Sequence, residues 1–138
     1  MFLMSVKPKY AKMILEKTKK YELRKKVPYL PRNTRIVMYA SGREKRIVGE
    51  FKVGFVYLLP IKDLWKLIEN DGGVSREEFF YYFRGYKEGY AIEIKEPKEY
   101  KNKPTLEELR EVLGKDFQPP INFMKVTGKL KLFLNSIN

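Results

Sequence analysis

The sequence predicts an α+β fold, a small β-barrel with short helices around it. Several short apolar, β-branched runs are typical of strands, and helical segments interrupt them. The helical crossovers are too irregular for repeated βαβ units, which argues against a doubly wound sheet. With 138 residues, of which 43% are hydrophobic, the chain is expected to form one domain over residues 1–138 with a packed core.

The first part of the chain predicts a strand, a helix and a second strand. Residues 2–6 are short and apolar. Pro8 suits the first position of a helix, because its missing N–H would be unpaired there anyway, and apolar residues recur at helical spacing to about residue 17. Residues 20–24 then alternate with period two, which indicates a short strand.

The middle of the chain predicts a β-hairpin. Residues 36–40 form one arm and residues 46–59 the other, with a turn between them. Gly49 and Gly54 in the long second arm indicate bulges or bends. Residues 89–95 alternate again and predict a further strand.

Helix signals divide the second half of the chain. Pro60 opens a helix that runs to about residue 70. Ser75 and Thr105 each begin a capping box, so each predicts a helix, and Gly114 should end the second. Residues 123–134 are expected to form one or two closing strands.

The positive charge is concentrated in the first third of the chain. Lys and Arg number 29 against 17 Asp and Glu, a net charge of +12. Residues 1–46 carry 14 basic and 3 acidic side chains, whereas residues 47–138 carry 15 and 14. This asymmetry favours a polyanionic partner, nucleic acid before an anionic membrane. Tyrosines that could stack on bases lie among these cations: Tyr10, Tyr21, Tyr29 and Tyr39.

Composition also excludes classes of protein. Without Cys or His there is no thiolate nucleophile, disulfide, Ser-His-Asp triad or usual zinc site, so we expect no metal and no cofactor. No apolar run approaches the roughly 18 residues that span a bilayer, and the first residues do not resemble a signal peptide. A cytoplasmic protein without membrane contact is expected.

The strongest candidate site is the segment 19–24, Lys-Lys-Tyr-Glu-Leu-Arg. One strand face would carry Lys20, Glu22 and Arg24, with Lys19 at its mouth. If this face lines a cleft, the Glu22 carboxylate would sit between a guanidinium and ammonium groups and could orient a base edge or a water. Lys19 and Arg24 would bind phosphate. The alternative is a solvated strand face with ordinary alternating charges.

Two other segments are weaker candidates. The aromatic run 79–83 could stack bases, but consecutive helical positions cannot all face one cleft, so most of these rings should be core. Residues 71–73, Asp-Gly-Gly, could form a ligand loop but are explained more simply as a helix stop.

The order and spacing of several blocks resemble an ASCH domain of the PUA-like superfamily, as found in archaeal proteins. These blocks are residues 4–11, 14–15, 19–24, 36–41, 47–51, 89–92 and 119–123. The resemblance implies a small barrel, a cleft beside the first helix and RNA binding. Lys19, Glu22 and Arg24 match the family pattern after that helix, and Lys17 replaces its usual turn Gly.

The resemblance also implies two possible activities. One branch of the family is an amidohydrolase acting on acetylated cytidine through Lys, Thr and Glu. Lys19 matches the Lys, but Glu22 replaces the Thr, and the Glu falls near Gly72 with Asp71 adjacent, which puts this activity in doubt. Another branch is ribonuclease-like, and that possibility stays open.

The favoured hypothesis is therefore a nucleic-acid-binding module, RNA first. The nucleic-acid-binding candidates are Lys7, Lys19, Lys20, Tyr21, Glu22 and Arg24. The alternative is a hydrolase acting on RNA or a modified nucleoside, with Lys19 and Glu22 as its catalytic residues. A third possibility is an interaction domain for an acidic protein, and no particular protein partner is implied.

Overall fold

A six-stranded mixed sheet and five helices make up the computed structural model, which describes all residues from 1 to 138. The strand order is β2-β5-β4-β3-β1-β6, with β1 parallel to β3 and the other pairs antiparallel. The strands are β1 (Phe2–Val6), β2 (Tyr21–Arg24), β3 (Arg35–Ala40), β4 (Arg46–Pro60), β5 (Glu88–Glu99) and β6 (Phe123–Lys125). The helices are α1 (Pro8–Leu15), α2 (Ile61–Ile68), α3 (Arg76–Tyr82), α4 (Leu106–Leu113) and α5 (Gly128–Ile137).

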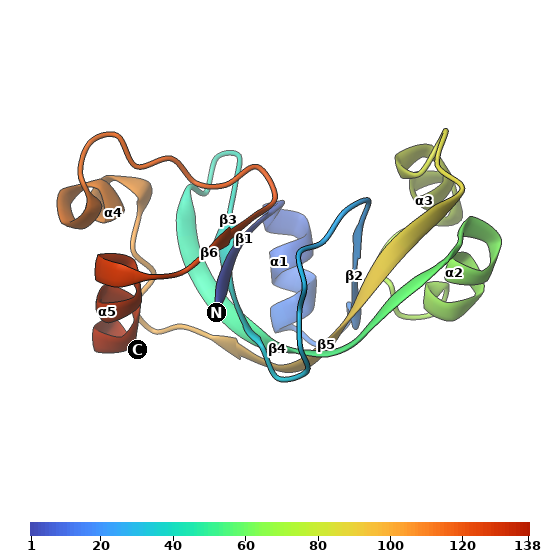
Figure 1. The fold of residues 1–138 in the computed structure, drawn as a ribbon, viewed down its shortest axis with the longest axis horizontal. Helices are drawn as coiled ribbons and strands as arrows, with labels where there is room; N and C mark the ends of the chain where they lie inside the picture. Colours follow the sequence, from blue (N-terminus) through green and yellow to red (C-terminus); the bar gives the residue numbers. More distant parts are fainter.

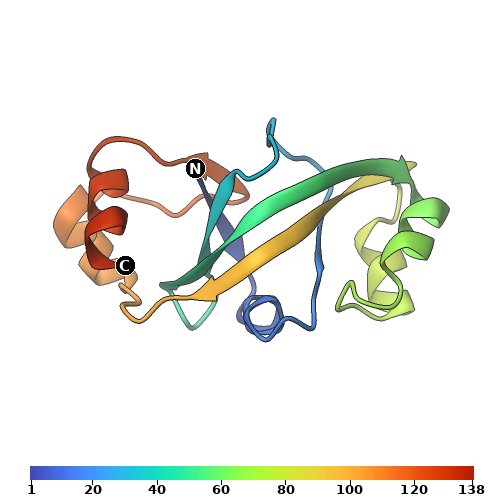
Figure 2. The same cartoon turned by 90° about the horizontal axis from the view of Figure 1, so that it is seen from below.

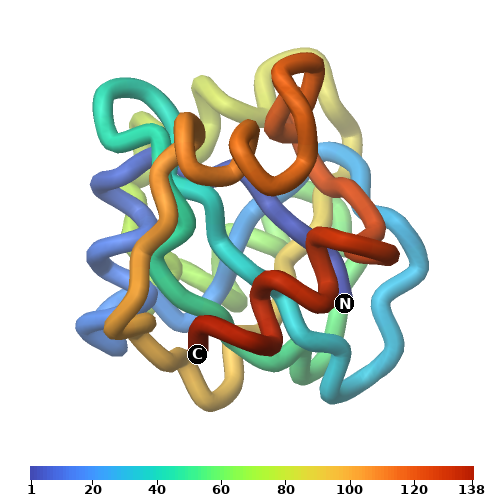
Figure 3. The backbone as a smooth tube through the Cα atoms, turned by 90° about the vertical axis from the view of Figure 1, so that its left-hand side faces the viewer, coloured from blue at the N-terminus to red at the C-terminus, as the bar shows by residue number.

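The long strands β4 and β5 run side by side along the molecule (Figure 2). Helices α2 and α3 lie at one end, α4 and α5 at the other, and α1 near the middle (Figure 1). Viewed along the long axis, the sheet curves into a half-barrel (Figure 3). The predicted α+β fold is confirmed, with the barrel left open between its edge strands β2 and β6.

Both faces of the sheet are covered, so alternate residues of one strand enter different cores. In β1, Met4 and Val6 pack with Ile14 of α1, whereas Leu3 packs with Leu130 of α5. This is the period-two alternation of a strand with apolar residues on both sides. The first core holds α1, and therefore the chain that follows it, against the sheet.

A third core joins α2 and α3 to one end of the sheet. Its buried members are Leu23, Leu64, Ile68, Phe79, Phe83 and Ala91. Because Leu23 belongs to β2 and Phe79 to α3, this core fixes the distance between the strand of the candidate segment and α3. None of the five helices is long and apolar enough to cross a bilayer.

The predicted hairpin and its bulges are confirmed. Strands β3 and β4 pair antiparallel, and the register shifts next to Gly49 and again near Gly54. A Cβ on Gly54 would lie 2.2 Å from Oε1 of Glu93, so a side chain at this bulge would displace the carboxylate of Glu93. Oε1 of Glu93 instead accepts the N–H of Phe55 at 3.1 Å.

Both predicted capping boxes are present. Ser75 Oγ accepts the N–H of Glu78 at 3.1 Å, and Glu78 Oε1 accepts the N–H of Ser75 at 2.9 Å. Thr105 begins α4 in the same way, and Gly114 ends it with φ of 107°.

The prediction for residues 123–134 is wrong in its second half. Only β6 is a strand, and α5 follows it. The Lys-Leu alternation of residues 129–132 imitates a strand, but Leu130 and Leu134 lie one helical turn apart and are both buried in the second core. Leu132, between them, is exposed. Packing against the sheet therefore decided the structure of a locally ambiguous segment.

Candidate functional site

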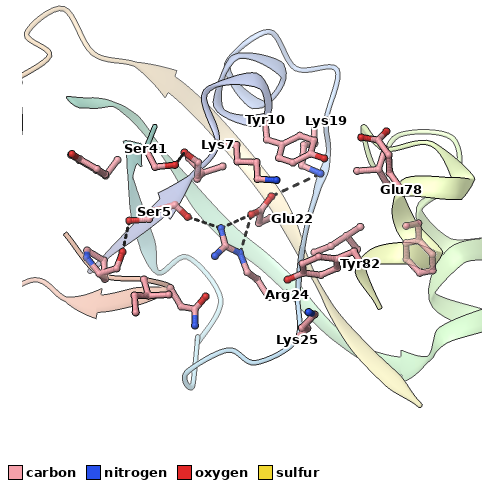
Figure 4. Close-up of a pocket in the computed structure, with 18 of the residues that line it drawn as sticks. Ser5, Lys7, Tyr10, Lys19, Glu22, Arg24, Lys25, Ser41, Glu78 and Tyr82 are labelled. Atoms are coloured by element: carbon pink, nitrogen blue, oxygen red, sulfur yellow. Dashed lines mark hydrogen bonds and ion pairs between the residues drawn. The ribbon is translucent and has the colours of Figure 1, made fainter. Parts of the chain in front are cut away.

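A pocket with a volume of about 760 Å³ lies between α1, β2, α3 and the loop that precedes β6 (Figure 4). Its charged lining contains five cations and two carboxylates: Lys7, Lys19, Arg24, Lys25 and Arg84, with Glu22 and Glu78. No group of three or more carboxylates is arranged to hold a metal ion. The pocket is therefore positively charged and suited to an anion.

The three residues that match the family pattern converge on the floor of this pocket. Glu22 Oε2 accepts hydrogen bonds from Arg24 Nε at 3.0 Å and Nη2 at 2.7 Å. Lys19 Nζ lies 3.9 Å from Oε1 of the same carboxylate. All three side chains are buried. Glu22 therefore lies between the guanidinium of Arg24 and the ammonium of Lys19, as expected if this strand face lines a cleft. That it orients a base edge or a water stays a prediction.

Lys19 is a buried cation whose ammonium group is held by contacts within the protein. Only 2% of it is exposed, and its Nζ donates to the carbonyl of Gly72 at 2.5 Å and lies 4.8 Å from the centre of the Tyr10 ring. Burial lowers the pKa of Lys19, and the negative charge of Glu22 partly opposes that effect. Direct contact between Lys19 and a phosphate would require this arrangement to open.

The Gly72–Gly73 turn covers Lys19, so residues 71–73 do more than end a helix. Gly73 has φ of 71°, and a Cβ there would lie 2.9 Å from Lys19 Cγ. Both the backbone conformation and the space require glycine. The turn thus closes the pocket floor behind Lys19.

Ser5 connects the pocket floor to the loop that forms one wall. Its carbonyl accepts a hydrogen bond from Arg24 Nη2 at 2.8 Å. Its hydroxyl donates to the carbonyl of Pro120 at 2.5 Å, and its N–H donates to that of Asn122 at 3.1 Å. Figure 4 shows Arg24 held between Ser5 and Glu22. Nη1 of Arg24 makes no hydrogen bond within the protein, so it is free to donate to a ligand.

The aromatic run 79–83 divides between core and pocket. Phe79 and Phe83 are buried and lie one helical turn apart, whereas Tyr81 and Tyr82 line the pocket and are partly or largely exposed. Phe80 also packs against the third core, so the expectation that most of these rings are core is met. Tyrosine suits the boundary because its ring packs while its hydroxyl stays in contact with water.

Cations lie over the tyrosines of this wall. Lys25 Nζ is 4.7 Å from the centre of the Tyr82 ring and 5.1 Å from that of Tyr86. The guanidinium of Arg84 is 3.9 Å from the centre of the Tyr81 ring. Alternating cations and ring faces of this kind can hold phosphates and bases together.

An ion pair joins α1 to α3 beside the pocket. Lys9 Nζ donates to Glu78 Oε2 at 3.2 Å, and both side chains are exposed. The backbone N–H of Ser75 and then Lys9 lower the pKa of Glu78 to about 2. Glu78, which completes the capping box of α3, therefore also lines the pocket.

Two of the predicted binding residues lie outside the pocket. Lys20 is exposed, and its backbone pairs with Asp71 at 2.7 Å and with Ile94 at 3.0 Å. These bonds hold it beside the α2–α3 connection, although strand alternation predicted that it would share the face of Glu22. Tyr21 packs instead against the ring of Tyr57, 6.4 Å between centres. Lys7, also predicted, does line the pocket.

Sequence reasoning missed the role of Ser5. Its one local signal is a hydroxyl inside the otherwise apolar run 2–6. The wall formed by residues 119–122 gave no signal beyond its place among the family blocks. Both depend on contacts across more than 100 residues of chain, as the bond from Ser5 to Pro120 shows.

The known families and curated proteins give limited matches. No family profile matches the chain. It is 24% identical over 112 residues to ribosomal protein uL22 of Ureaplasma parvum, covering 81% of this chain but 36% of that protein. The chain thus spans about a third of the length of that relative. It is also 25% identical over 116 residues to an ASCH domain-containing ribonuclease of Zymomonas mobilis, covering 84% of this chain and 77% of that protein.

Solved structures match the fold more fully. The crystal structure of ASCH from Zymomonas mobilis superposes with a TM-score of 0.92 over 99% of this chain and 94% of that one, at 23% identity. Human THYN1, crystallised with DNA containing 5-methylcytosine, gives a TM-score of 0.59 over 98% and 95% of the two chains, at 14% identity. The chain has the fold of an ASCH domain. The fold implied by the resemblance in the sequence is thereby confirmed.

Proposed function

We propose that this protein binds nucleic acid, RNA in particular, in the pocket beside α1. The observation that carries the proposal is Arg24, fixed by Glu22 and Ser5 with Nη1 left free in a positively charged pocket. A guanidinium held in this way is preorganised for a phosphate or a base edge. Two relatives support the choice of ligand, since one is named a ribonuclease and another was crystallised with DNA.

The lining residues divide into those that would contact the ligand and those that would hold them in place. Lys7 and Lys25 are accessible at the pocket and would neutralise backbone phosphates. Lys19 and Glu22 are buried and would act through Arg24 by fixing its orientation. Tyr82 would offer a ring face to a base.

The test compares two pairs of lysines. The variant Lys7→Ala/Lys25→Ala removes cations at the pocket, and Lys129→Ala/Lys131→Ala removes two exposed lysines of α5 outside it. Each phosphate contact on a single strand contributes about −0.7 to the slope of log K against log salt. The pocket variant should therefore have a slope shallower by about 1.4.

The control pair should leave the slope near that of the unaltered protein. Binding is measured by fluorescence anisotropy of a labelled single-stranded RNA between about 50 and 300 mM salt, a roughly sixfold range that includes physiological ionic strength. Equal slopes for the two variants, or no affinity for any RNA, would contradict the proposal.

A hydrolase is the second candidate, because Lys19 and Glu22 form a cation–carboxylate pair in the same pocket as Arg24. A ribonuclease reaction would use these groups to move a proton and to stabilise phosphate charge. Hydrolysis of a modified nucleoside has less support, since Gly72 supplies a carbonyl where that branch has a carboxylate, and Asp71 does not line the pocket. Purified protein should turn over RNA, and folded Lys19→Ala and Glu22→Gln variants should not; RNA recovered intact after long incubation would remove this candidate.

A further inference from the structure

We infer that Ile121 is an apolar wedge that inserts between neighbouring bases of the bound strand. The wedge would make the pocket prefer single-stranded nucleic acid to duplex. This inference rests on the proposed function and adds a residue and a ligand form to it. Ile121 lines the same pocket as Arg24, on the loop just before β6.

The first argument is the exposure of Ile121 at a charged pocket. Its exposed fraction is 92%, the largest among the exposed apolar side chains of this chain. A single exposed aliphatic residue is ordinary on a protein surface. At this position it belongs to a pocket lining that also carries the cations Lys7, Lys25 and Arg84 and the tyrosine wall.

The second argument is that the backbone around Ile121 is fixed on both sides. Arg110 Nε donates to the carbonyl of Phe117 at 3.1 Å, before Ile121. Ser5 holds the carbonyls of Pro120 and Asn122, on either side of it. The preceding prolines, Pro119 and Pro120, restrict the backbone further. An apolar side chain is thus presented to solvent on a preorganised loop, which reduces the entropy lost on binding.

The third argument is the arrangement of the pocket around Arg24. In Figure 4, Ser5 lies on one side of Arg24 and Tyr82 on the other. Ser5 anchors the loop that carries Ile121, so the anchored part of this loop and Tyr82 lie on opposite sides of the guanidinium. A base between them could stack on Tyr82, while Ile121 separates it from the next base.

Preference for a single strand follows from the cost of unstacking. Apolar side chains that enter a duplex must separate stacked, paired bases, which costs free energy at every step that is opened. A single strand is already partly unstacked, so the same insertion costs less. Cations alone would not discriminate in this way, because duplex carries the higher phosphate density.

The experiment uses a single-stranded RNA with one 2-aminopurine, whose fluorescence rises when its neighbours unstack, and the corresponding duplex. The variant is Ile121→Ala, and the matched control is Leu132→Ala, which removes another aliphatic side chain that is 72% exposed but lies on α5 outside the pocket. The unaltered protein should raise the fluorescence at saturation and bind the single strand more tightly than the duplex. Ile121→Ala should bind the single strand about tenfold more weakly, or about 1.4 kcal/mol.

Ile121→Ala should also lose the fluorescence rise while keeping its salt slope, because its phosphate contacts are unchanged. Leu132→Ala should behave as the unaltered protein. Equal behaviour of the two variants, or saturated binding by the unaltered protein without a fluorescence rise, overturns the wedge and leaves nucleic-acid binding intact. Absence of binding by the unaltered protein itself overturns the proposed function, and the wedge with it.

Discussion

Replacing Glu22 by Gln should destabilise the folded protein strongly. Glu22 is the carboxylate that faces both Lys19 and Arg24, and neither cation has another carboxylate within ion-pair distance. The amide of Gln can still accept one bond from Arg24, but it removes the negative charge and turns its NH₂ donors toward other donors. Two buried cations would then face each other without compensation.

The magnitude follows from the burial of the cations. Lys19 is almost completely buried and Arg24 nearly so, so water cannot take the place of the carboxylate. Removing one partner of a buried pair costs about 3 to 5 kcal/mol. Because a domain of this kind is stable by about 5 to 15 kcal/mol, Glu22→Gln should lose a large share of the free energy of unfolding.

Urea unfolding followed by circular dichroism measures this loss. Glu44→Gln is the matched control, since Glu44 lies 3.9 Å from Arg46 in an exposed pair that contributes about 1 kcal/mol or less. Adding Lys19→Met to Glu22→Gln removes one uncompensated cation and should restore part of the stability. A loss below about 1 kcal/mol for Glu22→Gln, or no recovery in the double variant, would refute the reasoning.

Three further predictions concern single side chains outside the pocket floor. Lys17 has φ of 67°, in the left-handed region where glycine is not strained. Lys17→Gly should therefore stabilise the protein by about 0.5 to 1 kcal/mol in urea unfolding, which is the relief of this strain minus the entropy that glycine adds to the unfolded chain. A loss of stability would contradict this prediction. Tyr100→Phe should cost about 2 kcal/mol in the same assay, because the buried hydroxyl donates to the Glu50 carboxylate at 2.7 Å, and an unchanged midpoint would show that the bond contributes nothing. The pKa of Glu78 is lowered from 4.5 to about 2 in the folded state, so its carboxylate stabilises the fold above pH 4.5 and stops doing so as the pH falls toward 2. The difference in melting temperature between the unaltered protein and Glu78→Gln should therefore shrink between pH 5 and pH 2.5, and a constant difference would exclude this linkage.

Much of the fold could be predicted because its signals are local. The capping boxes at Ser75 and Thr105 use residues three positions apart, and the bulges coincide with Gly49 and Gly54. Residues 128–137 could not be assigned in the same way, since their Lys-Leu alternation suits a strand and only packing of Leu130 selects a helix.

The same distinction applies to the site. Lys19, Glu22 and Arg24 lie within six residues, so their convergence could be predicted from one turn and one short strand. Lys20 alternates correctly with Glu22, yet its backbone bonds to Asp71 and Ile94 keep it outside the pocket. The walls formed by α3 and by residues 119–122 depend on tertiary contacts that no local pattern encodes.

The open edge of the half-barrel couples ligand binding to local opening of the sheet. The edge strands β2 and β6 do not pair with each other, as they would in a closed barrel. Arg24 of β2 instead donates to the carbonyl of Ser5 in β1, the strand beside β6, and both residues line the pocket. A ligand that contacts both β2 and β1 would link these strands for as long as it stays bound. Amide hydrogen exchange in β2 should therefore slow when the ligand binds.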